Sequence, residues 1–199
     1  KPGWWNHVVG PGKPIDTNRF FVLSSNCLGG CRGSTGPASE NPNGNEASMG
    51  GNFPDLSISD MIHAQKALID HFGICQLHAV IGGSMGGMQA LQWIVEYPGF
   101  AKNAIIIAAT AKHSVQTLAF NEAGRCSIRG DLAWEKGNYE KGAGPRKGLS
   151  VARMMAHITY LSDIGMEEKF GGDRRLDPTK EFEFSVQGYL DYQGKKFVD

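Results

Sequence analysis

The chain has 199 residues, of which 41% are hydrophobic and 20% charged, a composition typical of a folded domain rather than of a disordered chain. Twenty Lys and Arg residues balance twenty Asp and Glu residues, so the formal net charge is zero and no broad basic surface for nucleic acid or an anionic membrane is expected. No apolar run approaches the length of a membrane span, and the first residues, Lys1–Trp5, resemble neither a signal peptide nor a transit peptide.

The first part of the chain is predicted to contain more loop than regular structure. Residues 1–19 are expected to form an irregular loop, because proline and glycine punctuate them. The apolar run Phe20–Leu23 is bounded by polar residues and predicts a short buried strand. From Asn26 to about Pro54 the chain is rich in Gly, Asn, Ser and Pro, and a loop of this length inside a compact domain is usually functional or disordered.

The next part of the chain alternates between helices and strands. Ser57 and Asp60 form the pattern of a capping box, and apolar residues at helical spacing follow them. The predicted elements are, in chain order, a helix from 57 to 72, a strand over Leu77–Ile81, a helix over Met85–Glu96 and a strand over Ala104–Ala109. The last strand is almost wholly apolar, as expected for a strand covered on both faces. This order predicts a parallel sheet whose strands are joined by crossover helices.

A nucleophile motif lies between the middle strand and its helix. Gly82-Gly83-Ser84-Met85-Gly86 is a G-x-S-x-G sequence in a strand–turn–helix context, which is the context that a nucleophile elbow requires. Its glycines leave room where a tight turn has no space for a Cβ atom. Ser84 is therefore the candidate nucleophile, and the N–H of Met85 would face a developing oxyanion. The alternative is a tight strand–helix turn without chemistry.

The long loop after the first predicted strand offers two further candidates. In elbow enzymes a second oxyanion donor comes from such a loop, which points to the N–H of Leu28, although an ordinary glycine-rich turn is the alternative. Gly29–Gly33 also has the elbow spacing around Cys31, but no helix follows, so Cys31 is a weak alternative nucleophile. The glycine spacing fits neither a dinucleotide fingerprint nor a phosphate-binding loop.

From residue 114 the chain is predicted to be helical. The expected helices are 114–128, 149–160, 163–170 and 181–197. We therefore divide the chain into part of a sheet domain, residues 1–113, and a helical segment, residues 114–199, that could cover an active site. A triad in the order Ser, acid, His needs a later histidine, and only His113 and His157 follow Ser84. His113 closely follows the predicted strand Ala104–Ala109, with no later strand to carry the acid, and His157 lies in a helical run, so both are expected to serve surface or packing roles.

The four cysteines are Cys27, Cys31, Cys75 and Cys126. Their spacing fits neither a zinc site nor a small disulfide framework, and no bound metal is predicted. Reduced thiols in a cytoplasmic protein are the expected state.

Several longer strings resemble the homoserine O-acetyltransferase family. They are Gly3-Trp4-Trp5, Gly10–Lys13, Ile15–Thr17, Asn26–Pro37, Gly82–Ala90, Ala119–Glu122, Ala152–Met154 and His157–Tyr160. The resemblance covers nearly the whole chain and is far more specific than G-x-S-x-G. It implies an α/β-hydrolase fold, a mostly parallel sheet with flanking helices, together with a helical lid. It also implies that the chain is the middle of such an enzyme, incomplete at both ends.

The resemblance further implies an activity and a site. Acetyl would pass from acetyl-CoA, a co-substrate used without any bound cofactor, to the hydroxyl of L-homoserine in methionine biosynthesis. Ser84 would carry the acyl group, Leu28 and Met85 would supply the oxyanion N–H groups, Arg153 would bind the homoserine carboxylate and Tyr160 would line the same pocket. A homodimer through the lid is implied, and the catalytic Asp and His are expected beyond Asp199, so residues 1–199 alone would be inactive.

Other functions stay open at this point. O-Succinyl transfer to homoserine or serine is the nearest alternative, and transfer to another alcohol is a second. A plain esterase would differ by hydrolysing esters without CoA. A non-catalytic fragment or interaction module is favoured for the chain as it stands by the missing acid and histidine.

Overall fold

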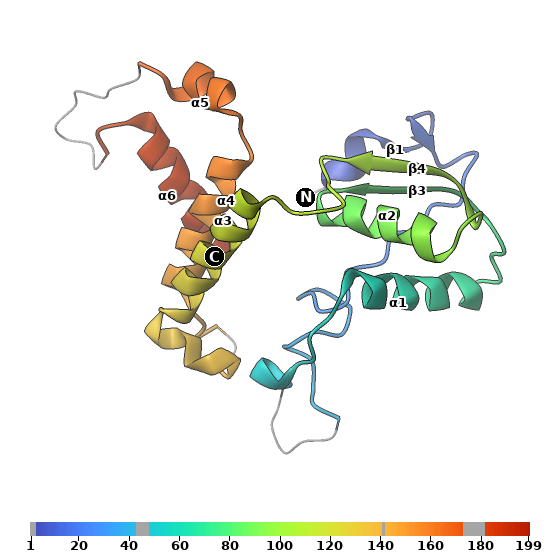
Figure 1. The fold of residues 1–199 in the computed structure, drawn as a ribbon, viewed down its shortest axis with the longest axis horizontal. Helices are drawn as coiled ribbons and strands as arrows, with labels where there is room; N and C mark the ends of the chain where they lie inside the picture. The colour runs from blue at the N-terminus through green and yellow to red at the C-terminus, as the bar shows by residue number, and fades with distance from the viewer. Residues whose placement is uncertain (1–2, 43–47, 141, 173–181) are drawn as a thin grey trace.

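The computed structural model describes residues 3–42, 48–140, 142–172 and 182–199, which form two lobes (Figure 1). One lobe contains the strands and the first two α-helices, and the other contains the helices that follow residue 114. Residues 108–114, which belong to no helix or strand, carry the chain from the first lobe to the second.

The N-terminal residues contain more regular structure than their sequence predicts. A 3₁₀ helix, η1 (Trp4–His7), is followed by two-residue strands β1 (Val9–Gly10) and β2 (Ile15–Asp16). These strands pair in parallel, Val9 with Ile15. The expectation of an irregular loop over 1–19 is therefore wrong for residues 4–7, 9–10 and 15–16. The turn between the two short strands, which contains glycine and proline, brings these strands close enough to pair.

The predicted strand Phe20–Leu23 is also wrong, since this segment has no strand assignment. Its apolar rings still pack on the first lobe: the Phe20 ring lies 4.7 Å from the His78 ring, and the Phe21 ring lies 6.1 Å from that of Phe72. Phe21 is nevertheless 74% exposed. Apolar composition alone does not make a strand, because a strand also needs a partner whose backbone groups are in register.

Helix α1 (Ile58–His71) begins at the predicted capping box. The N–H of Asp60 donates to Ser57 Oγ over 3.2 Å, and the N–H of Ser57 donates to Asp60 Oδ2 over 2.8 Å. The Ser57 hydroxyl also donates to Asp60 Oδ2 over 2.6 Å, and this bond, followed by that of the Ser57 N–H, lowers the pKa of the Asp60 carboxyl below its ordinary value. The helix is followed by Gly73 at φ +67°, a backbone conformation that glycine adopts without a steric cost.

The central unit is strand, helix, strand: β3 (Leu77–Gly83), α2 (Met85–Glu96) and β4 (Ala101–Ile107). The two strands pair in parallel with Ile81 opposite Ile105, as the alternation predicts. Helix α2 packs on one face of the pair, and α1 packs against α2 on the same side (Figure 1). The core between them contains Ile62, Ile69, Val80, Ala90 and Trp93.

The expectation that the second strand is covered on both faces is wrong for the described residues. Ile105, Ile106 and Ile107 are 47%, 36% and 43% exposed. Strand β4 pairs with β3 and with no other strand in the described ranges. Its composition is that of an internal strand, yet its side chains lack neighbours on one side.

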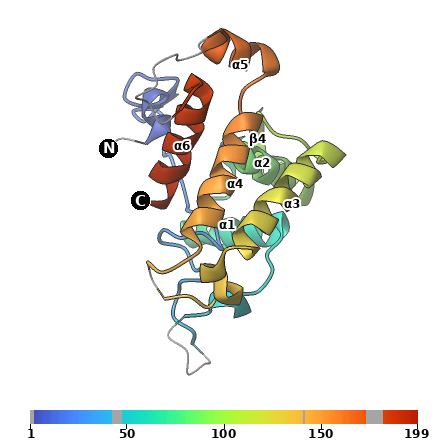
Figure 2. The same ribbon diagram turned by 90° about the vertical axis from the view of Figure 1, so that its left-hand side faces the viewer.

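The second lobe is built, in its described residues, from helices joined by non-helical segments, with one isolated bridge residue at Phe184. Its elements are α3 (Val115–Arg129), η3 (Leu132–Gly137), α4 (Arg146–Thr159), α5 (Asp163–Phe170) and α6 (Ser185–Val198). Helix α4 packs against both α3 and α6 (Figure 2). Close approach depends on glycine, since a Cβ at Gly148 would lie 2.4 Å from Ser127 O and one at Gly194 would lie 2.3 Å from Ser150 Oγ. No described helix is long and apolar enough to span a membrane.

Candidate active site

Ser84 occupies the junction between β3 and α2. Its backbone lies at φ 55° and ψ −122°, its N–H donates to Ile107 O over 2.9 Å, and its carbonyl accepts from the N–H of Gly87 over 2.9 Å. These bonds fix the turn from both strands and from the helix. The side chain is exposed, at the strand ends that point towards the helical lobe (Figure 1).

Two glycines make this turn sterically possible. A Cβ at Gly82 would lie 2.0 Å from Gly86 O, and one at Gly87 would lie 2.5 Å from Ala109 Cβ. Gly86 differs, because no heavy atom outside its own chain neighbourhood lies within 4 Å of its Cβ position. The strand can therefore pass directly into the helix only where Gly82 and Gly87 have no side chain.

The N–H of Met85 is the first of α2 and has no acceptor within the helix. The positive end of the helix dipole lies at the same place, so an oxyanion on Ser84 would be stabilised there. Met85 itself is 42% exposed. This is the N–H that the sequence predicts to be an oxyanion donor.

The loop of Leu28 is folded on itself and lies beside α2. The N–H of Gly30 donates to Cys27 O over 3.0 Å, and the N–H of Gly29, which has φ +79°, donates to Thr35 O over 2.8 Å. Cys27 Sγ accepts a hydrogen bond of 3.6 Å from Gln89 Nε2, on α2. Leu28 is half-buried within this turn. The alternative nucleophile Cys31 is exposed in a bend, and all four cysteines are free.

No histidine or carboxylate in the described ranges hydrogen-bonds to Ser84. His113 lies in the connection between the lobes. His157 lies on α4, where Nδ1 is 2.8 Å from the Tyr189 hydroxyl and Nε2 is buried without a partner among the described atoms. Burial lowers the pKa of His157, and the nearby charges of Arg153 and Lys169 lower it further. A neutral ring held among tyrosines fits a packing role.

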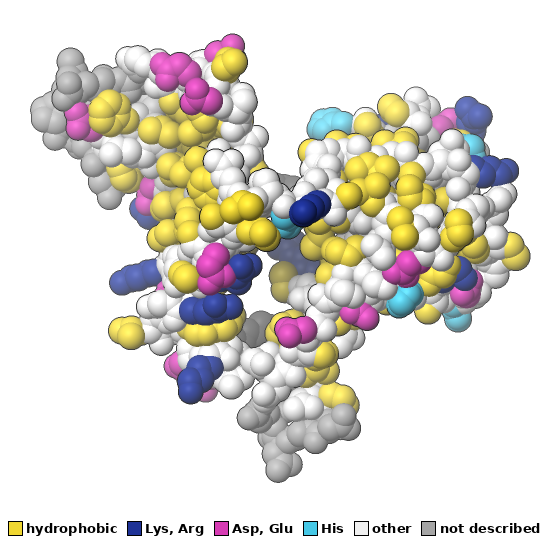
Figure 3. Space-filling model, in the orientation of Figure 1, with side chains coloured by type: hydrophobic (Ala, Val, Ile, Leu, Met, Phe, Trp, Pro, Cys, Tyr) yellow, Lys and Arg dark blue, Asp and Glu magenta, His cyan; other side chains and the backbone are white. Residues whose placement is uncertain are grey.

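Arg153 and Tyr160 lie together on the helical lobe. Arg153 is on α4, and Tyr160 is the residue that caps this helix. The Arg153 guanidinium donates to the Tyr160 hydroxyl over 3.4 Å and lies 5.0 Å from the centre of the Phe197 ring. Tyr160 is 62% exposed. The described contacts join these two residues to each other and not to Ser84 or Leu28, which belong to the sheet lobe. Figure 3 shows an open hollow between the lobes.

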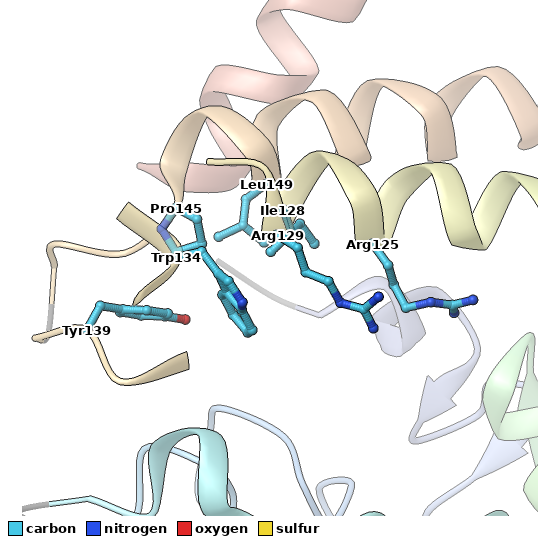
Figure 4. Close-up of a pocket in the computed structure, with 7 residues that line it drawn as sticks. All are labelled: Arg125, Ile128, Arg129, Trp134, Tyr139, Pro145 and Leu149. Atoms are coloured by element: carbon cyan, nitrogen blue, oxygen red, sulfur yellow. The ribbon is translucent and has the colours of Figure 1, made fainter. Parts of the chain in front are cut away.

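A further hollow, which the sequence did not indicate, lies within the helical lobe. It has a volume of about 310 Å³ and is lined by Arg125, Ile128, Arg129, Trp134, Tyr139, Pro145 and Leu149 (Figure 4). Glu122 forms ion pairs with Arg125 at 2.6 Å and with Arg129 at 3.7 Å. Its single negative charge therefore offsets one of the two arginine charges. No group of three or more metal-ligating side chains occurs in the part of the chain that is described.

Comparison with known proteins is consistent with this geometry. A family model described as alpha/beta hydrolase fold matches residues 2–198. A homoserine O-acetyltransferase of Methanobrevibacter ruminantium is 56% identical over 203 aligned positions, covering the whole chain and 41% of that protein. One of Leptospira biflexa is 53% identical, covering the whole chain and 52% of that protein. The chain thus spans about half the length of these curated relatives.

Solved structures are similar over the whole chain. The homoserine O-acetyltransferase of Bacillus anthracis has a TM-score of 0.89 at 28% identity, and the chain covers 56% of it. Esterase E22 has a TM-score of 0.84 at 31% identity, and the chain covers 57% of it. The same fold therefore occurs in a transferase and in an esterase.

Proposed function

The chain belongs to the α/β-hydrolase fold family, and from this premise we propose that it provides the acyl-carrying serine of a homoserine O-acetyltransferase. The enzyme would transfer acetyl from acetyl-CoA to the hydroxyl of L-homoserine, a step of methionine biosynthesis, with no bound cofactor. The observation that carries the proposal is Ser84, exposed at a strained strand–helix turn beside the first backbone N–H of α2, which has no acceptor within the helix. Relatives 51–56% identical across the whole chain bear this name, which supports the choice of reaction.

In the first half-reaction, Ser84 Oγ attacks the thioester carbonyl and loses its proton to a general base. The N–H groups of Met85 and Leu28 stabilise the negative charge on the tetrahedral oxygen. The carbon–sulfur bond then breaks, CoA leaves as its thiol after taking up the proton, and acetyl remains on Ser84. We propose a histidine outside residues 1–199 as the base, since the described residues place none at Ser84 and the relatives are about twice as long.

In the second half-reaction, the homoserine hydroxyl attacks the carbonyl of the acetyl-serine and loses its proton to the same base. The ester bond to Ser84 Oγ then breaks, the base returns the proton to that oxygen, and homoserine leaves as its acetyl ester. Arg153 is the proposed partner of the homoserine carboxylate, in a charge-assisted hydrogen bond, and Tyr160 is proposed to line the same pocket. The Arg153–Tyr160 contact of 3.4 Å supports a shared site. Both residues must approach Ser84 across the hollow between the two lobes. Closure of that hollow would also keep water from the acyl-serine.

The protein is further proposed to act in the cytoplasm as a homodimer through its helical lobe. Support comes from apolar side chains on that lobe that solvent reaches: Val115 is 83% exposed, Leu118 51% and Ile164 70%. Apolar patches of this kind mark association surfaces when they are contiguous. Sedimentation of the complete protein tests the dimer, and a monomer at micromolar concentration would refute it.

The acyl-serine is tested by incubating the complete protein with acetyl-CoA in the absence of acceptor. Mass spectrometry should find one acetyl group on the peptide that carries Ser84, together with a burst of free CoA. Ser84→Ala should abolish both. An unmodified Ser84 in an enzyme that transfers acetyl, or acetyl on Cys31, would refute the proposal.

The likeness to esterase E22 makes hydrolysis the second candidate function. Transfer and hydrolysis differ in the fate of the acyl group, so products should be counted with acetyl-CoA, succinyl-CoA and 4-nitrophenyl acetate, each with and without homoserine. O-Acetylhomoserine as the main product supports the transferase. Rapid ester hydrolysis that ignores homoserine and CoA supports the esterase instead.

Residues 1–199 expressed alone are proposed not to turn over, because a serine hydroxyl without a base is scarcely ionised near neutral pH. The free edge of β4 and its exposed isoleucines should also promote association. The test compares CoA release by this folded segment with release by the complete protein. Equal, homoserine-dependent rates would mean that His113 or His157 serves as the base.

A further inference from the structure

A chain of side-chain hydrogen bonds runs from the core of the sheet lobe to the loop of Leu28. Trp93 Nε1 donates to Gln65 Oε1 over 2.7 Å, and Gln65 Nε2 donates to Gln89 Oε1 over 2.5 Å. Gln89 Nε2 then donates to Cys27 Sγ over 3.6 Å. The relay joins α2, α1 and the loop, and it ends one residue before Leu28.

The direction of this relay follows from its first member. An indole N–H can only donate, so Gln65 must present its oxygen to Trp93 and its NH₂ group to Gln89. Gln89 must in turn present its oxygen to Gln65 and its NH₂ group to Cys27. The sulfur of Cys27 is thereby the acceptor, and both amide orientations are determined without assigning them individually.

Burial makes the relay costly to interrupt. Gln89 is 5% exposed and Trp93 is 4% exposed. Among the described residues, Gln89 is the one polar side chain that is buried. A buried amide is tolerated when both of its ends are hydrogen-bonded. An apolar side chain would fill the same space without this requirement, so the amide needs a reason beyond packing.

The position of Gln89 suggests that reason. It lies on α2, four residues after Met85, so the helix carries one candidate oxyanion donor and also the side chain that contacts the loop of the other. Most of the loop's other hydrogen bonds are internal: Gly29 N–H donates to Thr35 O and Ser34 Oγ donates to Asn26 O. The loop is thus a preformed unit, which Gln89 attaches to the helix of the elbow.

We propose that Gln89 is a positioning residue for the oxyanion hole, which holds the N–H of Leu28 through Cys27 at the distance from Met85 that an acyl oxygen on Ser84 requires. The inference rests on the proposed acyl-serine role of Ser84. It does not depend on the identity of the acyl donor or acceptor, because every acyl group forms the same tetrahedral oxygen.

The test uses a fluorophosphonate, which phosphonylates an active serine and places its oxygen in the oxyanion hole whatever the natural substrate. Loss of an oxyanion donor slows catalysis by about 10²–10³-fold, so displacement of Leu28 should slow the labelling of Ser84 by about 10–50-fold. Cys27→Ala removes the acceptor and Gln89→Met removes the donor at similar length. Both are expected to show this loss in the complete protein, and Cys27→Ser, which restores an acceptor, should recover part of the rate.

Three measurements separate positioning from general damage. Affinity for CoA, which has no acyl oxygen, should stay within about twofold of the wild-type value. The Cys27→Ala/Gln89→Met double variant should be no slower than the slower single variant, because both interrupt one relay. Cys75→Ala, at an exposed cysteine away from the relay, should label at the wild-type rate.

The inference is overturned if folded Cys27→Ala labels within about twofold of wild type, or if the two single effects multiply in the double variant. Wild-type protein whose Ser84 is labelled rapidly but which does not acetylate homoserine would overturn the proposed function. The relay would still be supported if the Cys27 and Gln89 variants were labelled more slowly than this wild type. The two failures are therefore distinguishable.

Discussion

Replacement of Ser84 by glycine should stabilise the fold while it removes the nucleophile. The Ser84 backbone at φ 55° and ψ −122° matches the first central position of a type II′ turn, about +60° and −120°, where glycine is the usual residue. A non-glycine residue in such a region is strained by about 1–3 kcal/mol. No hydrogen bond of Ser84 Oγ is present within the described ranges to offset the strain.

The magnitude follows from two opposing terms. Glycine would relieve about 1–3 kcal/mol of strain, but its greater freedom in the unfolded chain destabilises the fold by about 0.4–1 kcal/mol. The net gain is about 1 kcal/mol. Ser84→Ala removes the same hydroxyl and keeps the Cβ atom, so it should leave the free energy of unfolding within about 0.5 kcal/mol of wild type.

The assay is denaturant unfolding of the complete protein, with wild type, Ser84→Gly and Ser84→Ala measured side by side. Both variants should be inactive, and the glycine variant should be the more stable of the two. Lys136→Gly is a control at an exposed residue with φ 55° and ψ 25°, an ordinary left-handed conformation, and should gain less. A glycine variant no more stable than the alanine variant would refute the claim that the elbow is strained.

Three further outcomes are expected. Gly82→Ala should destabilise the fold by at least about 1–3 kcal/mol and abolish labelling of Ser84, because its Cβ would lie 2.0 Å from Gly86 O. Gly86→Ala, the control, should keep the stability of the fold. Equal effects of the two variants in unfolding experiments would contradict the steric argument. Arg153→Ala should lower transfer to homoserine by about 2–5 kcal/mol of transition-state stabilisation and spare acetylation of Ser84; an equal fall in both half-reactions would make Arg153 structural. His157 has a lowered pKa in the fold, so the unfolded chain binds its proton first and stability should fall as pH drops from the unfolded pKa, about 6.5, towards the lower folded pKa. His157→Gln should flatten this part of the profile of unfolding free energy against pH, and an unchanged slope would exclude His157 as its source.

Local rules predicted the elbow unit and several helix ends. The helix Met85–Glu96 and the helix Asp163–Phe170 have the predicted bounds, and α1 begins at the predicted capping box. The strand before the elbow extends two residues further than predicted, to Gly83. At the start of α1 the decisive interaction is between residues a few positions apart, Ser57 with Asp60, whereas the strand before the elbow also depends on its pairing with β4.

Elements that depend on distant partners were predicted less well. Phe20–Leu23 has the composition of a strand but no strand partner, and Ile105–Ile107 have the composition of a buried strand but are exposed. The short helix η3 was not predicted, although the Asp131 carboxylate caps it and also accepts from the Gly148 N–H over 2.9 Å. The amino-acid composition of a segment does not determine which distant residues the segment will contact.

For the candidate site the same division holds. The sequence by itself determined that Ser84 stands at a tight strand–helix turn, because Gly82 leaves room for the carbonyl of Gly86, only four residues later. Only the tertiary structure decided that Gln89 reaches Cys27 across 62 positions of the chain. That contact depends on how α2 and the loop pack in three dimensions, and hydrophobic spacing along one element carries no information about a hydrogen-bond partner on another. The Arg153–Tyr160 contact is different, because both residues lie on α4 and its cap, two helical turns apart.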